Sequence, residues 1–296
     1  MPDLVTVFGG SGFLGRAVVA ALAPCWTVRV AARHPNRGID PKAAGVSGVE
    51  ADIRDGEMVG HAIAGSAAVV NAVGLYSERG GETFAAVHVE GAERVARAAS
   101  DAGVQRLVHV SGIGVYSESP SAYVRARADG ERRVREAFEN AVIVRPSVII
   151  GPDDALLGGL DAVTRLAPII PLFGRGDTRL QPVFVHDVAR AVSAVLEHAS
   201  PLPIYELGGA CTCTYRELVQ MVLAHRGRRR LLAPFPLFAW NAIATVASLL
   251  PSPPLTPDQL ELMRADNVVA AEGVGTFADL GITPGAVDEL LDRCLS

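Results

Sequence analysis

Residues 4–23 read Leu4-Val-Thr-Val-Phe8, then Gly9-Gly-Ser-Gly-Phe-Leu-Gly15, then Arg16-Ala-Val-Val-Ala-Ala-Leu-Ala23, and this stretch decides the fold. A short apolar strand leads into a glycine-rich turn, and the turn opens a helix. In that context glycines at this spacing indicate dinucleotide binding. A tight turn with a purely structural role is the alternative.

Each glycine of the turn has a physical reason. Gly9 lets the chain turn sharply off the strand, Gly12 lets a pyrophosphate approach the backbone, and Gly15 lets the helix pack closely on the sheet. The free N–H groups and the positive dipole end of the helix would face the phosphates. The residues predicted to hold the cofactor here are Gly9, Ser11, Gly12, Phe13, Leu14 and Gly15.

Composition excludes several classes of protein. The chain has 296 residues and is 49% hydrophobic, which supports a sizeable buried core. Its net charge is −5, with acids and bases interspersed, and this predicts no nucleic-acid partner. The four cysteines fit no zinc or redox spacing, so we expect no metal and a reducing, cytoplasmic location. Asp153 and Asp154 lack a third ligand at a sensible spacing and favour a loop.

Strands and helices alternate beyond the glycine turn. This alternation predicts an α/β fold, a doubly wound parallel sheet of the Rossmann type. We expect a dinucleotide-binding domain over 1–150, to which 183–200 returns, and a smaller carboxyl-terminal capping domain from 151–182 and 201–296. The predicted strands cover 26–32, 49–53, 67–74, 106–111, 141–146 and 183–187, and the predicted helices cover 84–99, 123–138 and the residues up to His198.

The end of the second strand bears on the choice of cofactor. An Asp or Glu there would hydrogen-bond the adenosine ribose of NAD, but the sequence reads Ala31-Ala-Arg33-His-Pro35. A guanidinium at this point suits a 2′-phosphate. We therefore expect NADP(H) to be preferred, with NAD(H) as the weaker ligand. The alternative is that Arg33 is an ordinary solvated loop residue.

Two further strand ends are candidate cofactor contacts. Asp52 and Ile53 lie at the carboxyl end of the third predicted strand, where open α/β sheets bind ligands, and are placed to touch the adenine. The fourth strand runs through Asn71, Ala72 and Val73 into Gly74, which permits close backbone approach. A plain strand-end turn explains the second group equally well.

Ser111, Tyr123 and Arg127 are the candidate catalytic residues. Tyr123 and Arg127 are four apart on a predicted helix, so their side chains are neighbours. A fixed cation would lower the pKa of the phenol, which could then act as general acid or base in hydride transfer. Ser111 ends the fifth predicted strand and could orient a carbonyl. Tyr123 and Arg127 would also contact the cofactor.

The glycine turn, Asp52-Ile53, Asn71–Gly74, the Ser111 strand end and Arg145-Pro-Ser147 together resemble extended or atypical short-chain dehydrogenases/reductases. That resemblance implies a catalytic Tyr with a Lys four residues later. Here arginine replaces the lysine. Arginine keeps the charge but is larger, planar and differently hydrogen-bonded, so the electrostatic part of the role can survive while the ribose contact is lost.

A narrower resemblance covers nearly the whole chain. To the motifs above it adds Val87–Ala92, Arg179–Val185 with Asp187, Pro254–Gln259 and Asp266–Val268. These are similar to the NADPH-binding accessory subunit of respiratory complex I and to its bacterial epimerase-like relatives. The resemblance implies a tightly held NADPH, little or no turnover, and attachment to a respiratory membrane complex.

The carboxyl-terminal region carries a separate signal. Arg226, Arg228, Arg229 and Arg230 precede a largely apolar stretch, Leu231–Leu250, whose prolines make it a poor transmembrane helix. A basic cluster beside such a stretch suits a membrane surface or a hydrophobic partner, and would place the protein at the periphery of the inner membrane. A solvated turn followed by a core helix is the alternative.

The sequence thus leaves two functions open. One is a weakly catalytic or non-catalytic NADP(H)-binding protein that works in a larger complex. The other is an NADPH-dependent reductase or epimerase that acts on a carbonyl compound or a nucleotide-sugar. Arg127 favours the first, and retention of Tyr123 with a nearby cation favours the second.

Overall fold

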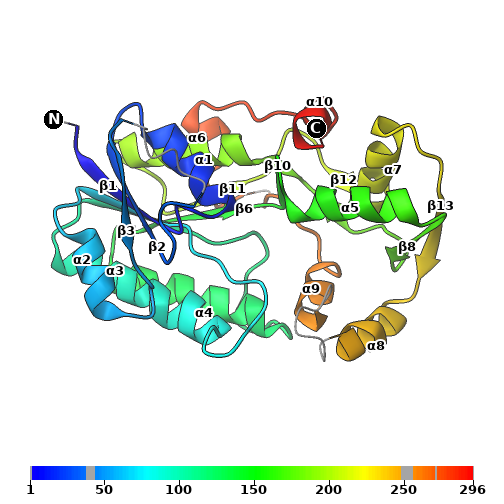
Figure 1. Ribbon diagram of the computed structural model, residues 1–296, viewed down its shortest axis with the longest axis horizontal. Coiled ribbons are helices and arrows are strands. Elements are labelled where there is room, and N and C mark those ends of the chain that lie inside the picture. The colour runs from blue at the N-terminus through cyan, green and yellow to red at the C-terminus, as the bar shows by residue number, and fades with distance from the viewer. Residues whose placement is uncertain (1, 38–43, 248–255, 271, 296) are drawn as a thin grey trace.

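A computed structural model describes residues 2–37, 44–247, 256–270 and 272–295. Its centre is the predicted parallel sheet, in the order β11-β6-β5-β4-β1-β2-β3 (Figure 1). The order reverses between β1 and β4, so the sheet is doubly wound as predicted. The strands are β1 (Leu4–Phe8), β2 (Thr27–Ala32), β3 (Val46–Glu50), β4 (Ala68–Asn71), β5 (Arg106–Val110), β6 (Val142–Pro146) and β11 (Ile204–Leu207).

Helices cover both faces of the sheet. On one face α1 (Phe13–Leu22) packs against α6 (Val185–Glu197), and on the other face lie α2 (Gly56–Ile63), α3 (Ala92–Asp101) and α4 (Ala122–Ala137) (Figure 1). Each face buries its own apolar cluster against the strands. Strands buried on both faces explain why their sequences are nearly continuous runs of apolar residues.

Three predicted element boundaries need correction. The third strand is Val46–Glu50 and not 49–53, so Asp52 and Ile53 follow it in a turn. The strand predicted over 183–187 ends at Phe184, because α6 begins at Val185 and takes His186 and Asp187 into its first turn. The helix predicted over 84–99 begins with π-helical geometry over η1 (Ala85–Gly91) and continues as α3.

The rest of the chain forms short elements at the carboxyl ends of the strands (Figure 1). The apolar stretch Leu231–Leu250 divides into β13 (Leu231–Phe235) and α8 (Leu237–Ala247), and its residues 248–250 lie outside the described residues. In the described ranges no helix is both long and apolar enough to cross a membrane. These elements are β7 (Ile149–Ile150), α5 (Ala155–Leu166), β8 (Ile169–Phe173), β9 (Arg179–Leu180), β10 (Val183–Phe184), β12 (Cys213–Thr214), α7 (Tyr215–His225), β13 (Leu231–Phe235), α8 (Leu237–Ala247), α9 (Pro257–Leu262), η2 (Ala278–Leu280) and α10 (Val287–Cys294).

A late segment of the chain completes one edge of the sheet. Gly275 N donates to Ile204 O at 2.9 Å, and Glu206 N donates to Gly275 O at 2.8 Å. Nearby, Asn267 Oδ1 accepts from Ser147 Oγ at 2.6 Å and from Val148 N at 2.9 Å. The last part of the chain therefore pairs with β11 and contacts the residues that follow β6.

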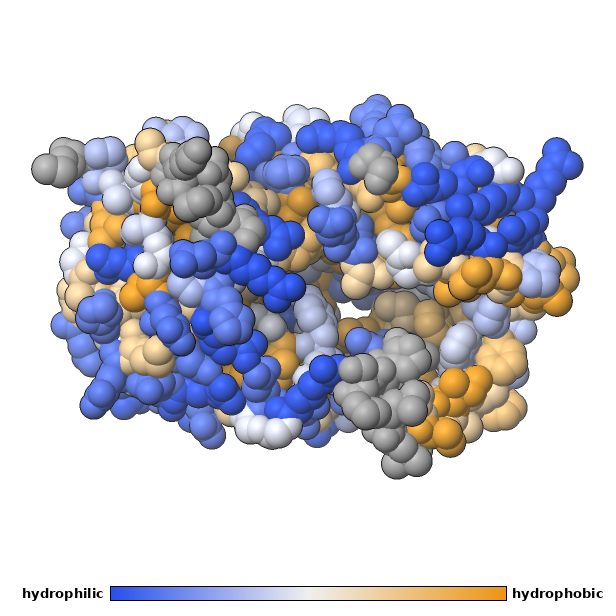
Figure 2. Space-filling view, viewed as in Figure 1, coloured by the Kyte–Doolittle hydropathy of each residue, from blue (hydrophilic) through white to orange (hydrophobic). Residues whose placement is uncertain are grey.

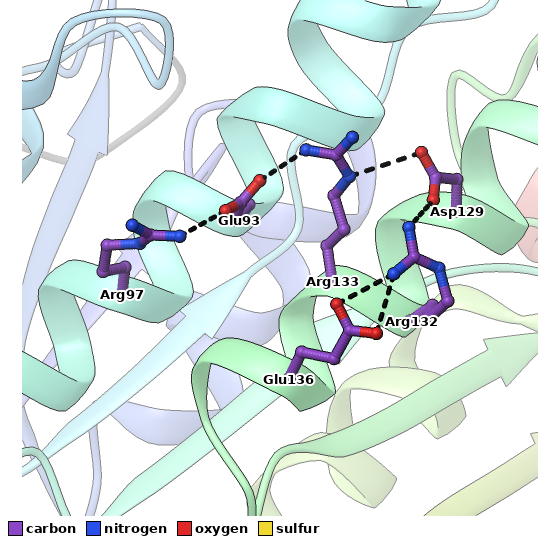
Figure 3. A network of polar contacts seen from close by, with 6 residues as sticks. All are labelled: Glu93, Arg97, Asp129, Arg132, Arg133 and Glu136. Carbon is purple, nitrogen blue, oxygen red and sulfur yellow. Dashed lines mark hydrogen bonds and ion pairs between the residues drawn. The ribbon is translucent and has the colours of Figure 1, made fainter.

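Ion pairs and close packing fix α4 on α3. Glu93 of α3 accepts from Arg133 of α4 at 2.8 Å, within a surface network completed by Arg97, Asp129, Arg132 and Glu136 (Figure 3). Such exposed pairs contribute little one by one. The tighter constraint is Gly130, where a Cβ atom would lie 1.9 Å from His88 O. This packing sets the position of α4, which carries Tyr123 and Arg127.

Candidate functional site

A cleft of about 920 Å³ follows the carboxyl ends of the strands, where doubly wound sheets bind ligands. Its walls come from the glycine turn, from the ends of β2, β4, β5 and β6, and from α4, α5 and α9. In the space-filling view the surface is hollowed between the sheet half and the carboxyl-terminal half (Figure 2). The cleft therefore lies between the seven-stranded sheet with its helices and the carboxyl-terminal elements that include α5 and α9.

The glycine turn leaves backbone N–H groups open to the cleft. Gly9 has a φ of +75°, and a Cβ atom at Gly15 would lie 2.0 Å from Gly9 O. Gly12 caps α1 without any side-chain hydrogen bond, and the first turn of α1 holds no acid. An uncapped helix end without negative charge is an anion site. The cradle therefore fits the pyrophosphate of a dinucleotide.

The structure brings most of the predicted cofactor residues together. All of them line the cleft except Gly15 and Asn71. Gly15 is buried behind the turn, where it permits the close packing of α1. Asn71 is buried and its Oδ1 accepts from Val73 N at 3.2 Å, which holds the loop that contacts the cleft. The lining members are Gly9, Ser11, Gly12, Phe13, Leu14, Arg33, Asp52, Ile53, Ala72, Val73, Gly74, Tyr123 and Arg127.

Cations and acids meet at the end of the cleft beside β2 and β3. Arg33 forms an ion pair with Glu82, and its side chain is 56% exposed. Asp52 binds Arg54 at 2.5 Å, and this hydrogen bond lowers the pKa of the carboxyl group. Arg37 lines the cleft beside them. Three guanidinium groups and two carboxylates therefore line this end of the cleft.

Sequence reasoning missed several residues of the cleft. Arg54 lies in the turn after β3, and Arg37 lies in the turn after β2. Both could have been found from the sequence, because Arg54 follows Asp52 by two residues and Arg37 follows Arg33 by four. Tyr76 stacks on Tyr123 with ring centroids 5.7 Å apart, and nothing in the sequence pointed to it. The missed lining residues with charged or polar groups include Arg16, His34, Arg37, Arg54, Tyr76, Glu82, Ser147, Gln259 and Asn267.

Tyr123 and Arg127 contact each other in the buried part of the cleft. Arg127 Nη1 donates to Tyr123 Oη at 2.5 Å, and both side chains are buried. The expectation of a lowered phenol pKa is wrong. Burial raises the pKa of Tyr123 to about 12, because the loss of hydration outweighs the attraction of the phenolate to Arg127.

Arg127 is a buried cation without a carboxylate partner among the described residues. Glu131, one turn further along α4, binds Arg145 instead, with Nη2 and Oε2 2.6 Å apart. Burial, with the charge of Arg127, lowers the pKa of His88 and of His109 to about 3, so both imidazoles are neutral. An uncompensated buried charge is costly in an isolated protein, and a polar ligand in the cleft would offset it.

Ser111 also lines the cleft. Its side chain is buried, and its Oγ has no hydrogen-bond partner among the described residues. Gly112 follows it and lines the same wall. A buried hydroxyl without a partner is rare, and a ligand oxygen would complete its hydrogen bonding.

The acidic pair at 153–154 has a structural use. Asp154 caps α5, with its Oδ1 accepting from Leu157 N at 2.7 Å and its Oδ2 from Gly151 N at 3.1 Å. Asp153 is exposed, with a φ of 66°. Among the residues that the structure describes, no three His, Cys, Asp or Glu side chains are grouped to hold a metal ion.

Comparison with known proteins gives consistent matches. The model of the NAD dependent epimerase/dehydratase family matches residues 5–208. The alpha subcomplex subunit 9 of mitochondrial NADH dehydrogenase [ubiquinone] 1 from Arabidopsis thaliana is 31% identical, over 95% of this chain and 74% of the relative.

One other relative and one solved structure extend the comparison. The 4-hydroxy-2-methyl-3-oxo-4-farnesyl-3,4-dihydroquinoline-1-oxide ketoreductase of Stigmatella aurantiaca is 31% identical, over 82% of this chain and 79% of the relative. The crystal structure of the Bordetella bronchiseptica enzyme WbmG in complex with NAD has a TM-score of 0.75 and 17% identity, over 100% of this chain and 93% of that one. The structural match shows a shared fold.

Proposed function

Because this chain belongs to the NAD dependent epimerase/dehydratase family, we propose that it holds NADP(H) in the cleft as an accessory protein with little or no turnover. The observation that carries the proposal is the buried Arg127–Tyr123 pair, at the place where the short-chain dehydrogenase pattern has lysine and tyrosine. When bound, the nicotinamide would supply hydride chemistry; this chain supplies the groups around it.

The residues around the cleft divide by task. The open N-terminus of α1 would take the pyrophosphate, and Gly9 and Gly12 let it approach the backbone. Arg33 and Arg37 supply positive charge where a 2′-phosphate would lie, which supports a preference for NADP(H) over NAD(H). The carboxylate of Asp52 is paired with Arg54, so its negative charge is compensated and does not repel that phosphate.

Abstraction of a proton by Tyr123 is disfavoured in this arrangement. A phenol with a pKa of about 12 stays protonated near pH 7, so it cannot serve as a general base. Arg127 donates from Nη1 to Tyr123 Oη and from Nη2 to Val110 O at 3.4 Å, so two of its N–H groups are directed at protein atoms. Both features support a retained cofactor that stabilises the folded chain by mass action.

One face of the molecule fits a large hydrophobic partner. In α8 only Ala244 is buried, whereas Phe238 is 76% exposed and Val246 is 68% exposed. Leu231 of β13 continues this face, and Figure 2 shows hydrophobic residues gathered at this end of the molecule beside a hydrophilic region over α7. Exposed apolar surface of this kind marks an interaction site.

We assign this face to contact with a respiratory membrane complex, as suggested by the relatives that are subunits of such complexes. Of the basic cluster, Arg226 and Arg228 bind Asp161, and Arg230 Nε donates to Thr164 O at 2.8 Å, which leaves the exposed Arg229 beside the apolar face. A bare membrane is the competing partner. Flotation with anionic liposomes, comparing the unchanged protein with Phe238→Asp, separates the two: liposome binding that Phe238→Asp abolishes would replace the protein partner with lipid.

The nucleotide that co-purifies tests the central proposal. We expect stoichiometric NADP(H) that survives gel filtration and is not oxidised by a panel of carbonyl compounds. Protein that binds neither NADPH nor NADH in a titration would contradict it. Binding of NADH as tight as that of NADPH would contradict the cofactor preference alone.

A reductase is the second candidate, and the free Ser111 hydroxyl favours it because Ser111 could hold a substrate carbonyl. The Stigmatella ketoreductase supports the same function by similarity. Arg127→Lys separates the two proposals. A large gain of carbonyl-dependent NADPH oxidation in Arg127→Lys points to a disabled reductase scaffold, and substantial oxidation by the unchanged protein points to an active reductase.

A further inference from the structure

The part of the cleft beyond Tyr123 has apolar walls that come from several separate segments. Val115 and Leu262 pack on the cluster that contains Tyr123 and Val124. Met263, whose flexible thioether adapts to irregular shapes, follows Leu262 at the end of α9. We call this region the apolar subsite, and its lining residues are Ile113, Val115, Val124, Leu156, Leu180, Leu262 and Met263.

The apolar subsite lacks the groups that would bind a nucleoside diphosphate. Among the described lining residues, its segments contribute no Arg or Lys other than Arg127 of α4. Arg127 is bound to Tyr123, and the other guanidinium groups of the cleft belong to the glycine turn and to the turns after β2 and β3.

A helix end at the apolar subsite is occupied by an acid as well. The N-terminus of α5 is already capped by the carboxylate of Asp154, which would repel a diphosphate.

A small polar end adjoins the apolar walls. Ser111 is only 3% exposed as a residue, and its buried hydroxyl has no partner in the part of the chain that the structure describes. It can donate to a carbonyl oxygen, which would satisfy both groups away from water. The hydrocarbon part of the same molecule would then lie along the apolar walls.

We propose that the apolar subsite binds a carbonyl compound with a long hydrocarbon chain, its oxygen at Ser111 and its chain between α4, α5 and α9. This inference rests on the proposed function, because the dinucleotide is taken to fill the rest of the cleft. It makes a nucleotide-sugar the wrong ligand class for this chain. The charge distribution and the free hydroxyl carry the assignment together.

Calorimetric titration with a homologous series of ketones tests the proposal. Protein saturated with NADPH is titrated with 2-pentanone, 2-heptanone and 2-nonanone, and separately with UDP-glucose. Burial of each added methylene should tighten binding about fourfold, so the series should span a factor on the order of a hundred. Affinity that does not change with chain length, or UDP-glucose bound more tightly than 2-nonanone, would overturn the proposal.

A pair of variants tests where the hydrocarbon chain of the ligand lies. Leu262→Gln should weaken 2-nonanone binding about tenfold or more while NADPH affinity is kept. Leu202→Gln, at a half-exposed leucine outside the cleft lining, is the matched control and should change neither. Equal 2-nonanone affinity in both variants would move the ligand away from α9 and defeat the assignment.

The titration of NADPH is measured first and separately. Ketone binding that fails while NADPH binds refutes only the apolar subsite. NADPH binding that fails refutes the proposed function. The ketone series is repeated on nucleotide-free protein, so that the dependence of affinity on ketone length is measured whether or not NADPH binds.

Discussion

Asp258 Oδ1 accepts a hydrogen bond from Ser121 Oγ at 2.6 Å, across 137 residues of sequence. Ser121 is the N-cap of α4, and Asp258 is in the first turn of α9. The carboxylate also reaches Tyr123 N, at 3.4 Å. The carboxyl-terminal half therefore helps to cap the helix that carries the tyrosine of the site.

Removal of this contact should loosen the cleft. Asp258→Ala removes the acceptor of the Ser121 hydroxyl and the contact at Tyr123 N, although Ser121 Oγ still accepts from Val124 N, and should lower the free energy of unfolding by about 1–2 kcal/mol. Urea denaturation measures the loss. Glu261→Ala on the same helix removes a surface pair with Arg264 and serves as control. Equal effects of the two changes would show that α9 does not support α4.

Arg33 should discriminate between the two cofactors. Arg33→Ala removes a charge-assisted contact to a 2′-phosphate and should weaken NADPH binding about tenfold or more, while NADH affinity changes little. Fluorescence titration with both nucleotides measures the ratio. Arg135→Ala, at an exposed arginine of α4, is the control. A parallel loss for both nucleotides would mean that Arg33 does not read the phosphate.

Two glycines give opposite outcomes for the same substitution. Gly15→Ala places a methyl group 2.0 Å from Gly9 O and should destabilise the fold by about 3 kcal/mol and abolish nucleotide binding. Gly60→Ala, inside α2 with nothing within 4 Å of the new methyl, should instead stabilise by about 0.5–1 kcal/mol. Thermal unfolding with and without NADPH measures both. Near-normal binding by Gly15→Ala would refute the phosphate cradle.

Acid should unfold the protein through its buried histidines. The pKa values of His88 and His109 are about 3 in the folded chain, against 6.5 for a free imidazole. Since both folded pKa values are depressed, the unfolded chain binds more protons between pH 6.5 and pH 3, and stability falls as the pH falls through that window.

At pH 5 each histidine should cost on the order of 2 kcal/mol relative to pH 7. Denaturant titrations at the two pH values measure the difference, and His88→Gln should reduce it. His88 Nε2 lies 2.8 Å from Leu75 O, so His88→Gln also tests whether this contact holds the loop after β4. A pH dependence that His88→Gln leaves unchanged would contradict the assignment to His88.

The pattern of neighbouring residues predicted those elements whose geometry depends on neighbouring residues alone. The strand, glycine turn and helix at 4–23 are contiguous in sequence, so their geometry follows from adjacent residues. The sequence predicted the wrong direction for the shift in the pKa of Tyr123. The direction depends on burial by Tyr76, Phe84 and α9, and the spacing of residues along α4 does not reveal that burial. The long-range contact at Asp258 was likewise beyond any local pattern.

The segment around Gly275 that pairs with β11 has a consequence for synthesis on the ribosome. The edge of the sheet stays open until that late residue has been made, although the region that matches the family ends at residue 208. An open strand edge invites pairing with another chain. On the nascent chain β11 therefore lacks its Gly275 partner until residue 275 has left the ribosome, and wrong pairing at this edge is open until then.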